Sequence, residues 1–158
     1  MQLTQGLLGG FMKKFMGLFL MAAAFVLFSC ASSQQEVDSA FNNVYNTYAD
    51  ALITTGASNY TVKEGDTLSD IARNYYGANN AYYFPLIMLA SKDVVLDPDL
   101  IEPGMKLIIP DLQANTTNEK TKPRIKSYFK EIAEVYRKKG TSVAKKTRQA
   151  LLKISESL

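Results

Sequence analysis

The sequence predicts an α+β fold, in which a small strand–helix–helix–strand module with a two-stranded antiparallel sheet is flanked by amphipathic helices on both sides. Two β-prone runs, at 60–62 and 107–109, enclose two segments whose apolar residues recur at helical spacing. The same spacing recurs before the module, in 36–53, and after it, in 123–158. With 158 residues, the chain has room for one ordinary domain or for one small domain with appendages.

The first segment, 1–29, has the pattern of a secretory signal peptide. Lys13 and Lys14 precede an apolar run at 15–28, which is shorter than the roughly 20 residues that a membrane-spanning helix needs. We therefore expect a cleaved signal rather than a permanent span. Met12 is as suitable a start as Met1, because Met12-Lys13-Lys14 is a typical signal opening.

The sole cysteine follows this run directly, in Leu27-Phe28-Ser29-Cys30. These residues resemble the lipobox of bacterial lipoproteins, which implies that Cys30 becomes the lipid-modified first residue of an exported protein. A lone thiol in an exported protein has no disulfide partner, which favours this interpretation. The alternative is a chance cysteine in an ordinary secretory signal. We expect the segment 30–59 to hold the lipidated cysteine, a polar spacer and an amphipathic helix.

The flanking helix before the module is expected at 36–53. Its apolar residues recur every three or four positions, and Gly56 in the following linker is a plausible helix stop. These residues are Val37, Phe41, Val44, Tyr48 and Leu52.

The module itself begins with the strand at 60–62 and a turn at Glu64-Gly65-Asp66. Thr67, with Asp70 three residues later, resembles a capping box and predicts a helix that ends at Gly77. A second helix is expected at 82–90. The side chains expected to face the core are Leu68, Ile71, Ala72 and Tyr75 in the first helix, and Leu86, Leu89 and Ala90 in the second.

Pro85 must lie in the first turn of this second helix, because proline has no N–H to donate further in. Pro103-Gly104 then predicts a turn before the closing strand, which Pro110 ends.

The polar stretch 112–122 is predicted to be a linker, after which Pro123 opens a basic helical hairpin, 123–158. Gly140 marks the end of its first helix. Two sets of apolar residues at helical spacing define its buried faces: Ile125, Phe129, Ile132 and Tyr136, and then Val143, Thr147, Ala150, Leu151, Ile154 and Leu158.

The net charge of +3 hides a strong asymmetry, because acidic residues dominate 30–119 and basic residues dominate 120–158. Three interpretations of the basic tail stay open. It is a solvated face, it docks against the acidic body, or it contacts an anionic membrane or polymer. Nucleic acid is not an expected partner, because the protein is expected to be exported.

Two quoted segments carry a family resemblance: 60–77, YTVKEGDTLSDIARNYYG, and 97–110, DPDLIEPGMKLIIP. They resemble the two ends of a LysM domain, a small module that binds N-acetylglucosamine-containing polymers such as peptidoglycan and chitin. The resemblance places this domain at 60–111, about a third of the chain. Ser91 departs from the pattern, since asparagine is common at that position.

The resemblance implies a glycan-binding groove between two loops, 65–68 and 97–101. An N-acetyl sugar needs small polar groups for its amide and hydroxyls and an apolar surface for its methyl and ring faces. Leu100 and Ile101 are expected to supply that apolar floor. Each residue alone also has a structural interpretation as turn, cap or core. The glycan-binding residues are predicted to be Gly65, Asp66, Thr67, Leu68, Asp97, Pro98, Asp99, Leu100 and Ile101.

No catalytic residue, metal site or cofactor is expected. The chain has no histidine, its one cysteine is assigned to lipid, and it contains no HExxH, P-loop or GxSxG pattern. Asp97 and Asp99 could pair as in a glycosidase, but we interpret Asp97-Pro98-Asp99 as a loop.

The sequence therefore predicts a non-catalytic lipoprotein of the bacterial cell envelope, at the periplasmic face or the outer membrane, that links membrane to wall. The alternative is a LysM-fold scaffold without sugar binding, whose flanking helices recruit a protein partner.

Overall fold

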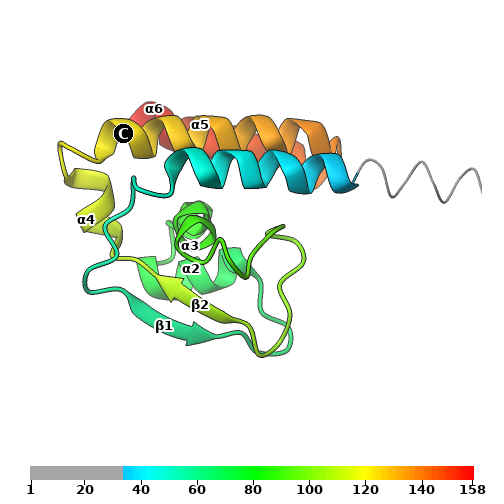
Figure 1. Cartoon of the computed structure of the whole chain (residues 1–158), viewed down its shortest axis with the longest axis horizontal. Helices are drawn as coiled ribbons and strands as arrows, with labels where there is room; N and C mark the ends of the chain where they lie inside the picture. The colour runs from blue at the N-terminus through cyan, green and yellow to red at the C-terminus, as the bar shows by residue number, and fades with distance from the viewer. Residues whose placement is uncertain (1–33) are drawn as a thin grey trace, which may run out of the picture. The chain divides into compact units, whose positions relative to one another are not determined.

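Two short antiparallel strands bring the ends of the central segment together. The computed structural model describes residues 34–158 (Figure 1). In it, β1 (Ser58–Thr61) pairs with β2 (Lys106–Ile109), with Ser58 opposite Ile109 and Thr61 opposite Lys106. The predicted signal peptide, Met12 and the Cys30 anchor lie outside the described residues.

Two helices follow β1 in the predicted order, α2 (Leu68–Tyr76) and, after the single turn η1 (Ala81–Tyr83), α3 (Phe84–Ala90). The hydroxyl of Thr67 accepts a hydrogen bond from the Asp70 N–H (3.1 Å), which confirms the predicted cap. Gly77 ends α2 with a φ of 98°.

The expected buried face of α2 is only partly right. Leu68, Ile71 and Ala72 are buried, but Tyr75 is 43% exposed, which corrects its placement in the core. Its ring instead packs edge-on against Tyr60 of β1, 5.9 Å between centroids. Tyr76 lies further in, and its hydroxyl donates to the Pro110 carbonyl (3.0 Å). Helical spacing alone does not show which neighbour covers the margin of an apolar stripe.

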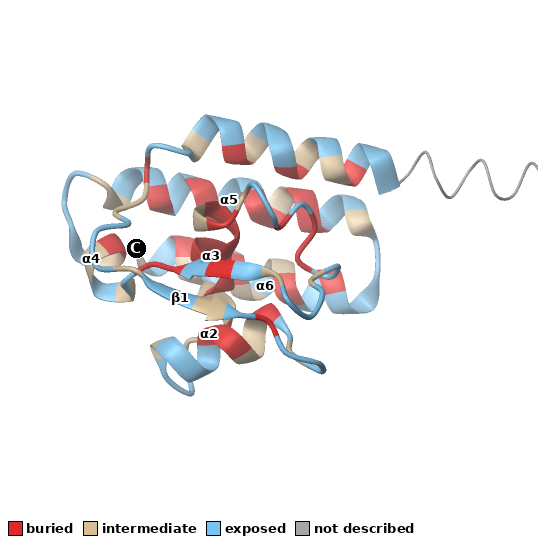
Figure 2. Ribbon diagram, turned by 60° about the horizontal axis from the view of Figure 1, so that its bottom comes forward, coloured by how far each residue is buried: buried red, intermediate tan, exposed pale blue. Residues whose placement is uncertain are grey.

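Helix α3 is the centre of the core (Figure 2). All residues from Phe84 to Leu89 are buried, so the predicted one-sided face of Leu86 and Leu89 extends around the helix, while Ala90 is only half-buried. Pro85 lies in the first turn as predicted. The Tyr128 hydroxyl donates to the Pro85 carbonyl (2.8 Å). A helix apolar all round must be covered on every side.

Within the module α2 and β2 contact α3, and α5 (Lys122–Lys139) covers it from outside through Tyr128 and Tyr136. Two further helices flank the module, the N-terminal helix, described from 34 to 48, and α6 (Ser142–Ser157). From Val37 onward, these helices and the module form one compact unit, Val37–Leu158. The N-terminal helix lies antiparallel to α5 (Figure 1), because Phe41 packs on Tyr136 and Tyr48 packs on Tyr128. None of the described helices has the length and apolar character that crossing a bilayer requires.

The N-terminal helix ends at residue 48, not at 53 as predicted. The chain turns there, since the Ala51 N–H donates to the Tyr48 carbonyl (2.8 Å). Further on, the buried Asn115 side chain accepts from the Ile53 N–H (2.8 Å) and donates to the Ile53 carbonyl (2.9 Å). These hydrogen bonds satisfy the backbone groups of Ile53 that a longer helix would have satisfied.

The predicted linker at 112–122 is also corrected, because 112–117 is the short helix α4 (Leu112–Thr117). Its polar composition suggests a loop, but the Asp111 carboxylate caps it by accepting from the Ala114 N–H (2.6 Å). The hairpin helices pair along their buried faces, and Gly140 ends α5 in the left-handed region, φ 69°.

Candidate functional site

The first predicted loop, 65–68, is held by its immediate neighbours. Gly65 has a φ of 82°, which favours glycine at this turn. The Asp66 carboxylate accepts from the Lys63 N–H (2.8 Å) and from the Tyr60 hydroxyl (2.7 Å). These bonds lower the pKa of Asp66, the Lys63 N–H contributing most, and the carboxylate raises the pKa of Tyr60.

Thr67 and Leu68 begin α2 at the end of this loop. The Thr67 hydroxyl caps the helix and donates to the Asp70 carboxylate (2.7 Å), while the Leu68 side chain is 3% exposed and belongs to the core. Thr67 and Leu68 therefore have the structural roles, helix cap and core residue, that were the alternative to sugar binding.

The second predicted loop, 97–101, contains a turn from Asp97 to Leu100, whose N–H donates to the Asp97 carbonyl (3.1 Å). Aspartate first and proline second are the preferred residues of such a turn. The Asp97 carboxylate also accepts from the Asp99 N–H (2.9 Å). Asp97 and Pro98 are buried, Ile101 is half-buried and Leu100 is 59% exposed.

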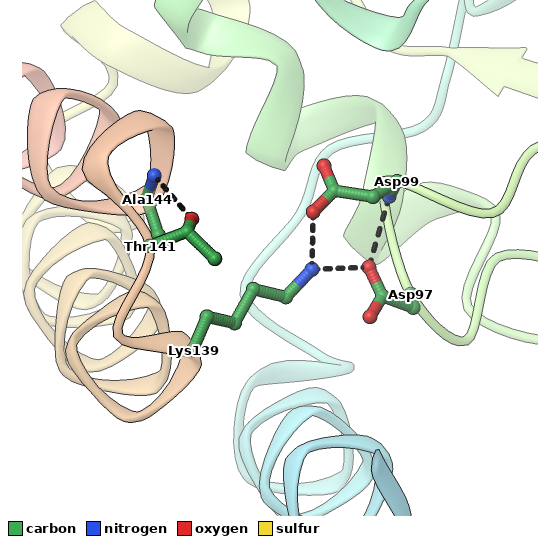
Figure 3. A network of polar contacts seen from close by, with 5 residues as sticks. All are labelled: Asp97, Asp99, Lys139, Thr141 and Ala144. Carbon is green, nitrogen blue, oxygen red and sulfur yellow. Dashed lines mark hydrogen bonds and ion pairs between the residues drawn. The ribbon is translucent and has the colours of Figure 1, made fainter. Parts of the chain in front are cut away.

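Lys139, at the end of α5, ties this loop to the hairpin (Figure 3). Its ammonium lies 2.5 Å from Asp97 Oδ1 and 2.5 Å from Asp99 Oδ2. The Lys139 side chain is 10% exposed and the Asp97 side chain 3%. The ammonium also lies 5.5 Å and 5.4 Å from the ring centroids of Phe41 and Tyr136. This contact matches one of the three interpretations of the basic tail, which is docking against the acidic body.

The two loops meet at a pocket of about 310 Å³, and the hairpin supplies its remaining wall. Four predicted residues line it: Thr67, Leu68, Pro98 and Asp99. Gly65, Asp66, Asp97, Leu100 and Ile101 are not part of its lining. Sequence reasoning missed the other lining residues, which are Ser69, Arg73, Ala81, Tyr82, Phe84, Tyr136, Val143 and Thr147.

Ser91, the departure from the expected asparagine, lies away from this pocket. Its hydroxyl accepts from the Ile108 N–H (2.8 Å), so it joins the end of α3 to β2. This contact gives Ser91 a role in the fold.

A larger pocket of about 400 Å³ lies at the other end of the sheet, where Ser58 and Ile109 pair. Tyr75, Pro110 and residues of α4 also line it. It is remote from both predicted loops, so volume alone does not select the site. Within 34–158, we find no group of three or more Cys, Asp or Glu side chains placed to hold a metal ion.

Residues 60–110 match the family model described as LysM domain. These residues form a LysM domain. The match spans the strand–helix–helix–strand module and both predicted loops. LysM domains are non-catalytic binding domains for N-acetylglucosamine polymers such as peptidoglycan.

Curated relatives share about the length of this domain. An uncharacterised protein of Deinococcus radiodurans is 48% identical over 56 residues, which are 35% of this chain and 21% of the relative. The potassium binding protein Kbp of Escherichia coli is 46% identical over 57 residues, 36% of this chain and 37% of the relative. The esterase Rv1288 of Mycobacterium tuberculosis is 35% identical over 65 residues, 41% of this chain and 13% of the relative.

The chain thus spans well under half the length of these relatives. No solved structure matches the chain.

Proposed function

We propose that this protein is a non-catalytic lipoprotein of the cell envelope, which binds peptidoglycan glycan strands through its LysM domain and links membrane to wall. The observation that supports the proposal is the convergence of both loops of the LysM domain on one pocket, whose remaining wall comes from the hairpin. The pocket is at the lower end of the roughly 300–1,000 Å³ range of ligand pockets, which suits a short stretch of glycan.

The lining has the chemistry that a neutral amino sugar requires. Hydroxyls of Ser69 and Thr147 can donate to and accept from sugar hydroxyls and the acetamido group. Pro98 and the ring of Tyr82 offer apolar surface for the ring faces.

The membrane part of the proposal rests on the sequence before the compact unit. Lipidation of Cys30 after removal of 1–29 would place the LysM domain at the periplasmic face or the outer membrane. Incorporation of labelled fatty acid that is lost in Cys30→Ser tests this anchor directly. A protein that stays labelled after this substitution would contradict it.

In the scaffold alternative, the packing of the flanking helices limits which of their surfaces a protein partner could contact. The apolar faces of the flanking helices are occupied, since Phe41, Ile125 and Phe129 are fully buried against the module and each other. A protein partner would therefore meet their outer faces, where Lys126, Lys130 and Lys145 are exposed. A partner that binds this lysine-rich surface of α5 and α6 would have to be acidic, and its binding would weaken steeply with salt.

Co-sedimentation with purified peptidoglycan tests the proposed function. We expect the soluble chain from residue 31, which contains the whole compact unit, to pellet with peptidoglycan at both low and high salt, without releasing muropeptides. Ser69→Trp should abolish binding by filling the pocket, and Asn74→Trp, exposed on the same helix outside it, should not. Failure of the wild-type chain to pellet at low salt would refute the proposal.

A further inference from the structure

Val143, in the first turn of α6, is 73% exposed although its helical spacing predicted a buried position. A single exposed apolar residue needs no explanation in itself. Val94 and Leu96 are also exposed, at 43% and 52%, yet neither lines the pocket. Val143 differs because it lines the same pocket as Thr67 and Pro98, residues of the two glycan loops.

The first turn of α6 is held firmly at this place. The Thr141 hydroxyl caps α6 by accepting from the Ala144 N–H (3.1 Å), close to the Lys139 contact with Asp97 and Asp99 (Figure 3). Ala144 and Thr147, which follow Val143 in α6, are buried. A wall that is already ordered loses little entropy when a ligand binds.

We propose that the hairpin is the third wall of the sugar site, and that Val143 contacts the acetamido methyl or ring face of a bound N-acetylglucosamine unit. The proposal rests on the proposed function and extends it beyond the LysM domain. Tyr136 and Thr147 complete this wall with an aromatic ring and a hydroxyl. Specificity for the sugar is then set partly by residues far outside 60–110.

Calorimetric titration of an N-acetylglucosamine tetramer into the chain from residue 31 tests this wall. Val143→Thr replaces one methyl with a hydroxyl and should weaken binding about fourfold, and Val143→Ala, which removes both methyls, should weaken it by up to about fifteenfold. Alanine is the stronger helix former, so lost affinity would not reflect a weaker α6. Val94→Ala, the matched control, should bind like the wild type, and circular dichroism should show all three variants folded.

The outcomes separate this inference from the function on which it rests. Wild-type affinity in both Val143 variants, with binding still abolished by Ser69→Trp, would overturn the hairpin wall and leave glycan binding in place. No binding by the wild-type chain would overturn the proposed function and this inference together.

Discussion

The two loops predicted to bind glycan, 65–68 and 97–101, are stabilised in different ways. Loop 65–68 depends on partners within six residues, since Tyr60 and Lys63 hold Asp66 and Asp70 is bonded to Thr67. Loop 97–101 has a local turn as well, but its carboxylates are bonded to Lys139, about forty residues later in the chain. The first loop is therefore a property of the LysM segment, and the second depends on the docked hairpin.

This difference indicates that the hairpin supports the second loop more directly than the first. Any change that loosens α5 or α6 should alter the second loop before the first. Three substitutions test this asymmetry.

The largest effect is expected from Phe129→Ala, in the middle of α5. Phe129 is fully buried and its ring packs on Tyr83 of η1 and on Tyr128. Loss of such a ring costs roughly 3–5 kcal/mol of unfolding free energy, measurable by urea denaturation with fluorescence and circular dichroism. Tyr75→Ala, at an exposed position, should cost much less. An unchanged denaturation midpoint in Phe129→Ala would show that the hairpin is not part of the module's core.

Lys139→Ala should have the next largest effect and the most specific one. It removes the Lys139 ammonium from the buried Asp97 carboxylate, which costs about 3 kcal/mol. Amide NMR shifts should change at 97–101 and stay small at 65–68. Lys130→Ala, on the exposed side of the same helix, is the control.

Asp97→Asn added to Lys139→Ala should recover part of the stability, because the neutral amide needs no counter-ion. Equal NMR shifts at both loops in Lys139→Ala would contradict a link confined to the second loop. An absence of recovered stability in the double variant would contradict it as well, because the link depends on the pairing of Lys139 with Asp97.

Asp66→Asn should have the smallest effect and leave the second loop unchanged. The bonds from Lys63 and Tyr60 lower the folded pKa of Asp66 below its ordinary 3.8, so they stabilise the fold above that pH. This contribution is lost as the pH falls through the lower folded pKa. The stability difference between wild type and Asp66→Asn should therefore shrink from about pH 6 to about pH 2.

Urea denaturation at these two pH values measures the difference. Glu64→Gln removes a charge from the same turn but keeps the two bonds to Asp66, so it should keep the pH dependence of the wild type that these bonds cause. A difference between Asp66→Asn and wild type that grows at acid pH would contradict the assignment.

The first loop could be predicted from the sequence because its determinants are local. A glycine with positive φ, a threonine cap and an acidic residue three positions later are short-range signals. The Asp97-Pro98 turn is equally local. Lys139 could not be singled out, because the hairpin is rich in basic residues. No residue near Lys139 in the sequence distinguishes it from the other lysines and arginines as the partner of Asp97.

The errors at Tyr75, Val143 and 112–117 have the same physical origin. Helical periodicity places residues on a face, but the covering element decides whether that face is buried. Tyr75 meets β1 and Val143 meets a pocket, so both stay exposed. The polar segment 112–117 is helical because Asp111 caps it and Asn115 bonds to the distant Ile53.

The central claim is that both loops bind one N-acetylglucosamine segment. Titration of an N-acetylglucosamine oligomer into the isotope-labelled chain from residue 31, followed by amide NMR, tests it most directly. We predict saturable shifts at 65–68 and 97–101, joined by Tyr136, Val143 and Thr147. An absence of shifts, or shifts confined to the pocket of Ser58, Ile109 and α4, would contradict the account.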